Sequence, residues 1–474
     1  SENLFMVGDE DQSIYGFRAA YPEALLTFEK NYPDAKVLLM EENFRSDARI
    51  VLAADRFIQK NTLRHEKHMK AARKPASDIR EISLRSRKAQ YTYLAKLAEG
   101  CTSQTAILYR DNECILPLVD LLERNGIPYQ MRNAELSFFS HRTILDIINI
   151  IKLAQNPMDT EAFLQIYYKI GTYLRKQDAI RIARISEEKR IPVLDVAAED
   201  PDLNGHVLGS VRSMRTHLQN LLQDSGERAL YRIMQYMGYQ EYLNRSGLSD
   251  SKLEILRILG SRADSPMELA ERLEQLKVLI REKEPDRKCP LILSTIHASK
   301  GLEYDSVYLI DVADGILPES IPQNLHQASA EELKAYEEER RLFYVGVTRA
   351  KDHLTLFTTN RPSTFCSEFL GKSSVTEEGR KNLMPVESRI SRTFKQARPY
   401  AAVAGIRQTK ASEELYFRLK EELGTGVIVE HKKYGEGVVT QLDDRLVHIM
   451  FQDDTLRMMD LKILANAGLL KVKK

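Results

Sequence analysis

Short apolar runs separated by helical stretches are the feature that most constrains the fold of this chain. Each run has the length of a strand, and the stretches between them carry apolar residues at helical spacing. Strands that alternate with helices favour a parallel sheet flanked by helices. The expected strands are Leu4–Val7, Ala35–Met40, Thr105–Arg110, Pro128–Arg132, two runs within 291–318, and His353–Thr359. The expected helices are Pro22–Asn31, Ser46–Lys60, Cys114–Asn125 and Ser329–Ala350.

This alternation is interrupted over residues 157–286, where strand candidates are absent and helical spacing dominates. We therefore expect an α/β domain with an all-helical insertion. Residues 371–422 are polar and poorly periodic, and we interpret them as a linker with some helix. Residues 423–474 alternate apolar and polar side chains, with turns expected at Tyr434–Gly437 and Leu442–Arg445. That pattern is typical of a small all-β barrel.

Composition places the chain among ordinary globular proteins. It has 474 residues, of which 43% are hydrophobic and 29% charged, so several domains are expected. No apolar run approaches the ~20 residues of a membrane span. The four cysteines lack disulfide or metal-ligand spacing, which favours a reducing cytoplasm and buried or incidental thiols.

Charge is balanced overall and uneven along the chain. Lys and Arg number 69 and Asp and Glu 68, giving a net charge of +1 that argues neither for nor against nucleic acid. The segment Lys60–Lys88 is strongly basic. It is either a solvated loop or a surface that faces phosphates.

The opening stretch "VGDEDQ" (residues 7–12) ends an expected strand with acidic residues, where α/β sheets place ligand chemistry. A calcium loop is excluded, because Ile14 and Ala20 stand where glycine and glutamate are needed. A magnesium-holding Asp-Glu pair needs a phosphate-binding G-x-x-x-x-G-K-[ST] loop as its partner. The only Gly-Lys-Ser is 371–373, and Cys366 replaces its leading glycine.

The motifs resemble those of the UvrD/PcrA/Rep-like superfamily 1 DNA helicases. "VGDEDQSIYGFRAA" (7–20) resembles motif III, "EENFRS" (41–46) motif IV, residues 295–318 motif V and residues 337–356 motif VI, in the family's order. "TAILYRDN" (105–112) resembles the strand after motif IV, and "HKKYGEGVV" (431–439) the terminal Tudor-like domain. The resemblance implies a C-terminal portion that starts at motif III, with the phosphate loop and the Asp-Glu box upstream.

The resemblance also implies a domain organisation. Residues 1–38 would be a remnant of the first RecA-like domain, and 39–156 with 288–370 the second RecA-like, P-loop NTPase type domain. Residues 157–287 would be the helical insertion called 2B, 371–422 a linker and 423–474 a Tudor/SH3-like β-barrel.

On the nucleotide side, the implied cofactor is ATP with Mg²⁺, whose ligands would lie upstream. Gln12 would sense the terminal phosphate, while Arg45 and Arg349 would reach it from the second domain. Phe44, where the family usually has tyrosine, would stack on adenine, Gly301 would lie close to the nucleotide, and Glu303 would accept the ribose hydroxyl. Arg340 and Arg341, beside Glu338 and Glu339, are interpreted as local helix ion pairs.

On the DNA side, the implied partner is single-stranded DNA and its junction with a duplex. Tyr15 and Phe17 would stack on bases, with phenylalanine at 17 where the family usually has tryptophan. Residues expected to contact DNA phosphates are Arg18, Thr295, His297 and, in the insertion, Lys169, Arg175 and Lys176. The family's duplex contact has two glycines, of which only Gly171 is kept here.

The function implied by the resemblance is ATP-dependent 3′–5′ DNA unwinding or translocation in repair, recombination or clearance of replication blocks. The alternative is a protein derived from a helicase that binds DNA and a partner without hydrolysing ATP. RNA polymerase or another protein is the implied partner of the barrel, and the implied location is the bacterial cytoplasm, at the nucleoid during activity. The isolated chain is expected to lack ATPase activity.

Overall fold

The computed structural model describes residues 5–16, 23–132, 136–247, 251–284, 286, 288–325, 327–359, 363–372, 419, 423, 427–432, 434–442, 446–451, 456–460, 464 and 469–472. It divides into two compact units, Ser1–Ser374 and Val375–Lys474. Each unit is described by itself below.

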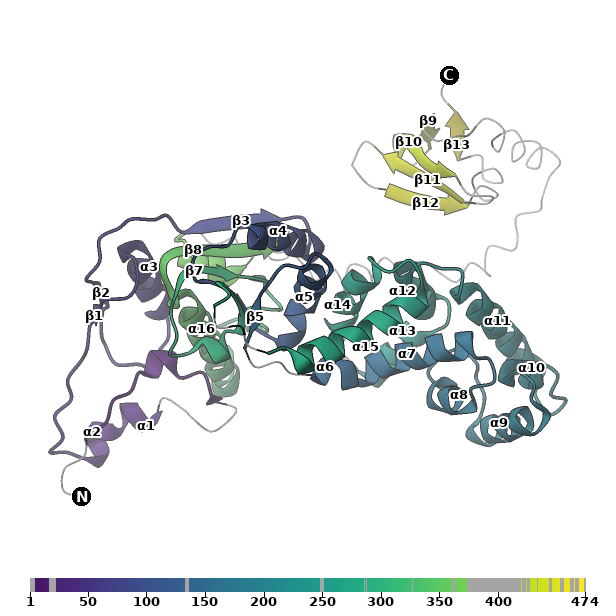
Figure 1. Ribbon diagram of the computed structural model, residues 1–474, viewed down its shortest axis with the longest axis horizontal. Coiled ribbons are helices and arrows are strands. Elements are labelled where there is room, and N and C mark those ends of the chain that lie inside the picture. Colours follow the sequence, from purple (N-terminus) through teal and green to yellow (C-terminus); the bar gives the residue numbers. More distant parts are fainter. Residues whose placement is uncertain are drawn as a thin grey trace. The chain divides into compact units, whose positions relative to one another are not determined.

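The first unit contains a fully parallel sheet of six strands in the order β3-β8-β7-β4-β6-β5 (Figure 1). The strands are β3 (Arg80–Leu84), β4 (Thr105–Tyr109), β5 (Gln130–Met131), β6 (Leu291–Thr295), β7 (Tyr304–Leu309) and β8 (Ala350–Thr359). The expected parallel sheet is thereby confirmed. Edge strand β3 was not expected, because its sequence "REISL" is too polar to read as a buried run.

Helices cover both faces of this sheet. Along β4, Ala106 and Leu108 join a core with α3 (Ala48–Ile58), α16 (Ala330–Val347) and α17 (Thr364–Phe369). Their neighbours Ile107 and Tyr109 join a second core with α4 (Arg87–Glu99) and with α5 (Leu116–Arg124), which follows the short helix η3 (Asn112–Ile115). Alternate residues of one strand therefore face opposite cores, which explains the continuous apolar runs.

Between β5 and β6 the chain is helical in the described residues. The helices are α6 (Ser137–Ser140), α7 (Arg142–Gln155), α8 (Thr160–Ile166), α9 (Lys176–Lys189), α10 (Val193–Ala198), α11 (Gly205–Leu221), α12 (Gly226–Gln235), α13 (Tyr239–Ser246), α14 (Ser251–Gly260) and α15 (Pro266–Glu282). The expected helical block is confirmed. Helix α7 packs against α8, α11, α14 and α15, so the helical packing begins before residue 157.

The segment before the sheet differs from expectation. The run expected at Leu4–Val7 forms no strand over its described residues 5–7, and Ala35–Met40 is also irregular and largely exposed. Both strand predictions are wrong, because a strand forms only where a neighbouring strand pairs with its backbone. The region instead contains η1 (Glu10–Gln12), α1 (Glu23–Leu26) and α2 (Phe28–Asn31). A two-residue parallel pair, β1 (Glu42–Asn43) with β2 (Lys70–Ala71), follows.

The second unit is a small antiparallel sheet in the order β12-β11-β10-β9-β13. Its strands are β9 (Ile428–His431), β10 (Gly435–Leu442), β11 (Leu446–Phe451), β12 (Leu456–Asp460) and β13 (Leu470–Val472), which confirms the all-β prediction. The turn expected at Tyr434–Gly437 lies earlier in the chain: Tyr434 is a turn residue, and Gly435 in β10 already pairs with His431 in β9. The other predicted turn, at 443–445, and most of the predicted linker lie outside the described residues.

Candidate functional site

The loop 9–16 is ordered by its own cap and by helix α16. Asp9 begins the short helix η1, and its side chain accepts the Asp11 N–H at 3.1 Å. Farther along, the Gly16 N–H donates to Glu338 Oε1 at 2.8 Å, and Arg341 Nε donates to the Ser13 carbonyl at 2.8 Å. The polar face of α16 therefore holds a loop that is more than 300 residues away in sequence.

Arg349 lies in the short connection between α16 and β8 and is 1% exposed. It donates to the carbonyls of Val345 and Leu302 at 2.9 and 3.2 Å. Its Nη2 reaches Gln12 Oε1 at 3.3 Å, so two residues predicted to act on the terminal phosphate meet. Within the described part of the chain, no carboxylate forms an ion pair with Arg349. Burial lowers its pKa to about 10, which leaves the guanidinium protonated at neutral pH.

Arg45 brings a second guanidinium to the same place. Its Nη1 donates to the Thr348 carbonyl at 3.4 Å, while Arg349 Nη2 donates to Thr348 Oγ1 at 3.2 Å. The charge of Arg45 also contributes to the lowered pKa of Arg349. The two guanidinium groups meet at Thr348, and the Gln12 amide contacts Arg349, so the arrangement suits an anion.

The residues predicted for the sugar and the base lie beside Arg45. Glu303 pairs with Arg45 at 2.9 Å and with Lys351 at 3.3 Å, and hydrogen bonds from both hold the pKa of Glu303 below its usual value. Phe44 is 72% exposed, so its ring is accessible for stacking. Gly301 has a φ of +83°, and a Cβ there would meet no atom within 4 Å. The backbone conformation, rather than packing in this chain, accounts for this glycine.

The predicted DNA residues gather partly at the other end of the loop. The Tyr15 hydroxyl donates to the His297 carbonyl at 3.1 Å, the His297 Nε2 lies 3.1 Å from the Ile14 carbonyl, and Lys300 Nζ lies 5.3 Å from the Tyr15 ring centre. Thr295 is buried and its Oγ1 accepts the Ala298 N–H at 3.1 Å. Phe17 and Arg18 lie outside the described residues.

The interpretation of Arg340 requires correction, and that of Arg341 is incomplete. Arg340 pairs with Glu368 on α17 and lies over the Phe57 ring at 4.6 Å, so it is not held by an ion pair within its own helix. Arg341 has a helical partner, Glu337 at 3.9 Å, but its nearer contact is Ser13. Glu368 and Ser13 are distant in sequence from these arginines, so helical spacing alone could not predict their contacts, whereas the local pair of Arg341 with Glu337 is present as expected.

Lys169 is likewise misassigned. It is 5% exposed, and its ammonium pairs with Asp146 on α7 at 2.5 Å, so it does not face solvent or a phosphate. The Tyr239 hydroxyl donates to the other Asp146 oxygen at 2.8 Å. Arg175 and Lys176, at the start of α9, are exposed and stay candidates for phosphate contact, although Arg175 pairs with Asp178 at 2.8 Å.

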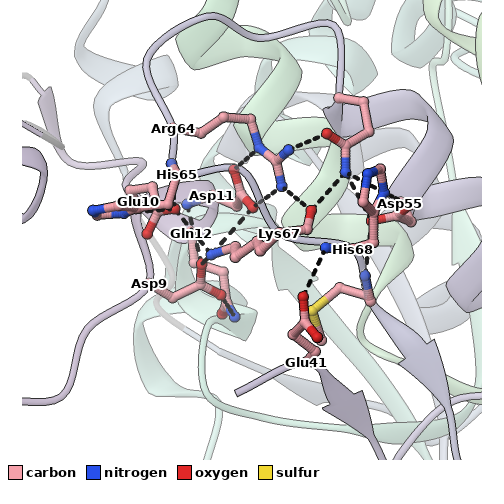
Figure 2. A network of polar contacts seen from close by, with 12 residues as sticks. Asp9, Glu10, Asp11, Gln12, Glu41, Asp55, Arg64, His65, Lys67 and His68 are labelled. Atoms are coloured by element: carbon pink, nitrogen blue, oxygen red, sulfur yellow. Dashed lines mark hydrogen bonds and ion pairs between the residues drawn. The ribbon is translucent and has the colours of Figure 1, made fainter. Parts of the chain in front are cut away.

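Sequence reasoning missed the ion-pair network around the acidic loop, which Figure 2 shows. Arg64 binds Asp11 through two contacts, at 3.0 and 2.9 Å, and Lys67 lies within 2.9 to 3.3 Å of carboxylate oxygens of Asp9, Glu10 and Asp11. At Arg64 and Lys67, the basic segment Lys60–Lys88 is therefore neither a solvated loop nor a surface that faces phosphates. The signal available in the sequence was the opposite charge of the acidic run Asp9–Asp11 and of Arg64 and Lys67, which lie more than 50 residues further along the chain.

The described residues lack two further features. They contain no group of three or more His, Cys, Asp or Glu side chains arranged to hold a metal ion. None of their helices combines the length and apolar character needed to cross a membrane.

Comparisons with protein families cover most of the chain. The model described as UvrD-like helicase C-terminal domain matches residues 38–361. The model described as UvrD/REP helicase N-terminal domain matches residues 1–33.

Three relatives illustrate the similarity to individual proteins. The YjcD protein of Bacillus subtilis is 30% identical over 75% of this chain and 48% of its own length. The ATP-dependent DNA helicase PcrA of Staphylococcus epidermidis is 27% identical over 94% of this chain and 63% of its own length. The ATP-dependent DNA helicase Rep of Escherichia coli is 29% identical over 77% of this chain and 56% of its own length. The chain thus spans about half to two thirds of these relatives.

Proposed function

The chain belongs to the family of UvrD-like helicases, and from that premise we propose that it is the portion of an ATP-dependent DNA helicase that links nucleotide hydrolysis to DNA contact. The observation that carries this proposal is that Arg349 meets Arg45 at Thr348 and also contacts Gln12. A buried guanidinium without a carboxylate partner is costly unless an anion binds beside it. A terminal phosphate supplies that anion.

The residues of this chain would hold ATP from one side. We assign Phe44 to the adenine face, Glu303 and the Gly301 backbone to the ribose, and Arg45 and Arg349 to the terminal phosphate. Hydrolysis of bound ATP supplies the free energy for movement along DNA. Arg349 and Arg45 would neutralise charge that develops on the phosphate, a role worth roughly 10³–10⁵ in rate for comparable arginines. We place the Mg²⁺ ligands outside the described residues.

The loop 9–16 would couple the two activities. Gln12 contacts Arg349, and Tyr15, three residues later, contacts His297. A shift of this loop on hydrolysis would therefore move both contacts together. We assign Tyr15, Phe17, Arg18, Thr295 and His297 to single-stranded DNA, with stacking by the aromatic rings and phosphate contacts by the others.

The finer features follow the family resemblance. We propose 3′–5′ movement, action at junctions of single-stranded and duplex DNA, and a role in repair, recombination or clearance of replication blocks in the bacterial cytoplasm, at the nucleoid during activity. We further propose that residues 1–38 belong to one RecA-like domain and 39–156 with 288–370 to a second. Residues 157–287 would be the 2B insertion, and the β-sheet of the second unit a Tudor-like module that binds RNA polymerase or another protein.

The direct test is strand displacement by the full-length protein, with ATP, on duplexes that carry a 3′ or a 5′ single-stranded tail. We expect displacement from the 3′ tail only, and none by the Arg349→Ala variant. Displacement from the 5′ tail would contradict the polarity. DNA binding without any DNA-stimulated hydrolysis would instead support a non-hydrolysing binding protein. The isolated 474-residue chain, which lacks a G-x-x-x-x-G-K-[ST] loop, should show no hydrolysis.

A further inference from the structure

One lysine holds three consecutive acidic residues. Lys67 Nζ lies 2.9 Å from Asp9 Oδ1, 3.1 Å from Glu10 Oε1 and 3.3 Å from Asp11 Oδ2 (Figure 2). Its side chain is largely buried, as are those of Glu10 and Asp11. A single ammonium that contacts three successive side chains fixes the orientation of the whole turn, not only the position of one residue.

The lysine is itself held by helix α3. Arg64 donates to the Lys67 carbonyl at 3.3 Å and to both oxygens of Asp11. Gln59, which follows the last residue of α3, donates to the Lys67 carbonyl at 2.7 Å and to Asp55 at 3.1 Å. Lys67 lies in an irregular segment, and these contacts tie its backbone to the end of α3.

Asp9 links Lys67 to Gln12. One of its oxygens, Oδ1, accepts Lys67 Nζ, and the other, Oδ2, accepts Gln12 Nε2 at 2.6 Å. On its other side, Gln12 Oε1 accepts Arg349 Nη2 at 3.3 Å. The contacts form a continuous chain from Lys67 through Asp9 and Gln12 to Arg349.

The charges at the two ends allow only one orientation of the Gln12 amide. A flipped amide would place its oxygen against the Asp9 carboxylate and its NH₂ group against the Arg349 guanidinium, and both contacts would be repulsive. The observed orientation satisfies both neighbours. It also fixes the plane of the amide, and hence the direction of its second N–H.

The chain of contacts crosses the boundary between the two family matches. Asp9 and Gln12 lie within residues 1–33, whereas Lys67 and Arg349 lie within 38–361. Any movement of one region relative to the other would loosen Lys67 and Arg349 from the loop together.

We propose that Lys67 is a positioning residue for ATP hydrolysis, which orients the Gln12 amide through Asp9 when the two regions close. The inference rests on the proposed helicase function and names a residue that acts through Gln12 without touching the nucleotide. Arg64 supports it by holding Asp11 and the backbone of Lys67.

The test uses the full-length protein and measures DNA-stimulated ATP hydrolysis together with nucleotide affinity. Lys67→Met removes the charge at similar length, and we expect kcat to fall roughly 10–100-fold, as for a misplaced catalytic group, with nucleotide affinity unchanged. Lys67→Arg should restore most of the rate. Lys70→Met is the matched control and should behave as wild type, because Lys70 is exposed and, among the described residues, its ammonium pairs only with Glu41, at 3.1 Å.

A double-mutant cycle separates positioning from a merely structural role. If Lys67 acts through Gln12, Lys67→Met should cost no further rate in a Gln12→Ala background. Additive losses, or a normal kcat in Lys67→Met, would overturn the proposal.

Asp9→Asn tests the same link without removing a buried cation. The asparagine amide would no longer dictate one orientation of the Gln12 amide, so this variant should reproduce the loss of kcat. Absence of hydrolysis in the wild-type full-length protein would overturn the proposed function and this inference together, whereas an active wild type with an equally active Lys67→Met overturns the inference alone.

Discussion

Residues 5–40 and the six-stranded sheet both contain apolar runs, and the two regions treat them differently. In the run Ala35–Met40, Leu38 and Met40 are 72% and 80% exposed, whereas Ile107 in β4 and Leu293 in β6 are completely buried. Both central strands pair with parallel neighbours and are covered by helices on both faces. Described residues 5–7 and 35–40 have no such neighbours. Apolar composition alone therefore does not make a strand.

Polar contacts hold the loop in the first region, residues 5–40, in place. Between its two apolar runs, the loop 9–16 is held by Arg64, Lys67 and Arg349 and by the helix α16. The sheet region depends on the removal of apolar surface from water, which is insensitive to charge. Substitutions in the two regions should consequently change different quantities.

The largest effect is expected where the two regions meet. In the full-length protein, Arg349→Ala removes the buried guanidinium that contacts Gln12, and kcat for ATP hydrolysis should fall by roughly 10³–10⁵ with nucleotide binding largely kept. Steady-state hydrolysis and titration of a fluorescent nucleotide measure the two quantities. Arg184→Ala is the control, because that side chain is exposed and its one ion pair in the described part of the chain is with Glu188 of its own helix, at 3.7 Å. A normal rate for Arg349→Ala would remove this residue from the site.

A pair of substitutions compares the apolar runs directly. Ile107→Ala in β4 leaves a cavity in the core and should lower the free energy of unfolding by about 2–5 kcal/mol. Leu38→Ala removes an exposed side chain and should change it by less than about 0.5 kcal/mol. Urea unfolding of the 474-residue chain measures both. If Leu38→Ala proves as costly as Ile107→Ala, the run Ala35–Met40 is packed in solution.

Much of the sheet region could be predicted because its signals are local. Strands β4 and β6 are buried along their whole length, β7 contains the apolar run Val307–Leu309, and α16 begins with the capping box Ser329–Glu332. The failures share a physical cause, which is dependence on a partner far away in sequence. Ala35–Met40 needs a neighbouring strand, Lys169 is neutralised by Asp146, and Lys67 is paired with Asp9.

Of the candidate site, residue types could be assigned from the motifs, but their contacts could not. The meeting of Gln12 with Arg349 spans 337 residues, and that of Tyr15 with His297 spans 282. Rules based on residue spacing apply within one helix or strand, so they cannot predict contacts over such separations. The acids beside Gln12 were read as a failed metal site, whereas Asp9 orients Gln12 and Lys67 holds Asp9.

A smaller effect is expected at the DNA end of the loop. Tyr15→Ala in the full-length protein should weaken binding of single-stranded DNA by about 1–3 kcal/mol, the range for loss of one stacking ring. Tyr15→Phe keeps the ring and loses the hydroxyl that contacts the His297 carbonyl, so it should bind nearly as well. Fluorescence anisotropy of a labelled strand measures the affinities. Equal weakening by both variants would assign the role of Tyr15 to its hydroxyl.

The smallest effect is a pH dependence of the polar region. Burial alone would raise the pKa of Glu10, but backbone hydrogen bonds and the charge of Lys67 outweigh it and lower the pKa. A carboxyl whose pKa is lowered by folding adds stability above its unfolded pKa of about 4.3, and this contribution disappears as the pH falls through the folded value. The stability difference between wild type and Glu10→Gln should therefore shrink below about pH 4.3. Urea unfolding at pH 7 and pH 4 tests this, and a difference that grows on acidification would contradict it.

The burial of Lys169 also determines how the helical region would respond to ions in solution. A buried cation paired with Asp146 neutralises no phosphate of an approaching duplex and so displaces none of the counterions condensed on it. If Arg175 and Lys176 contact phosphates, this region contributes about −1.8 to the slope of log K against log[salt], two contacts at −0.9 each, and not the −2.7 of three. The affinity of this region for a duplex would consequently fall less with rising ionic strength than the number of basic residues in its sequence suggests.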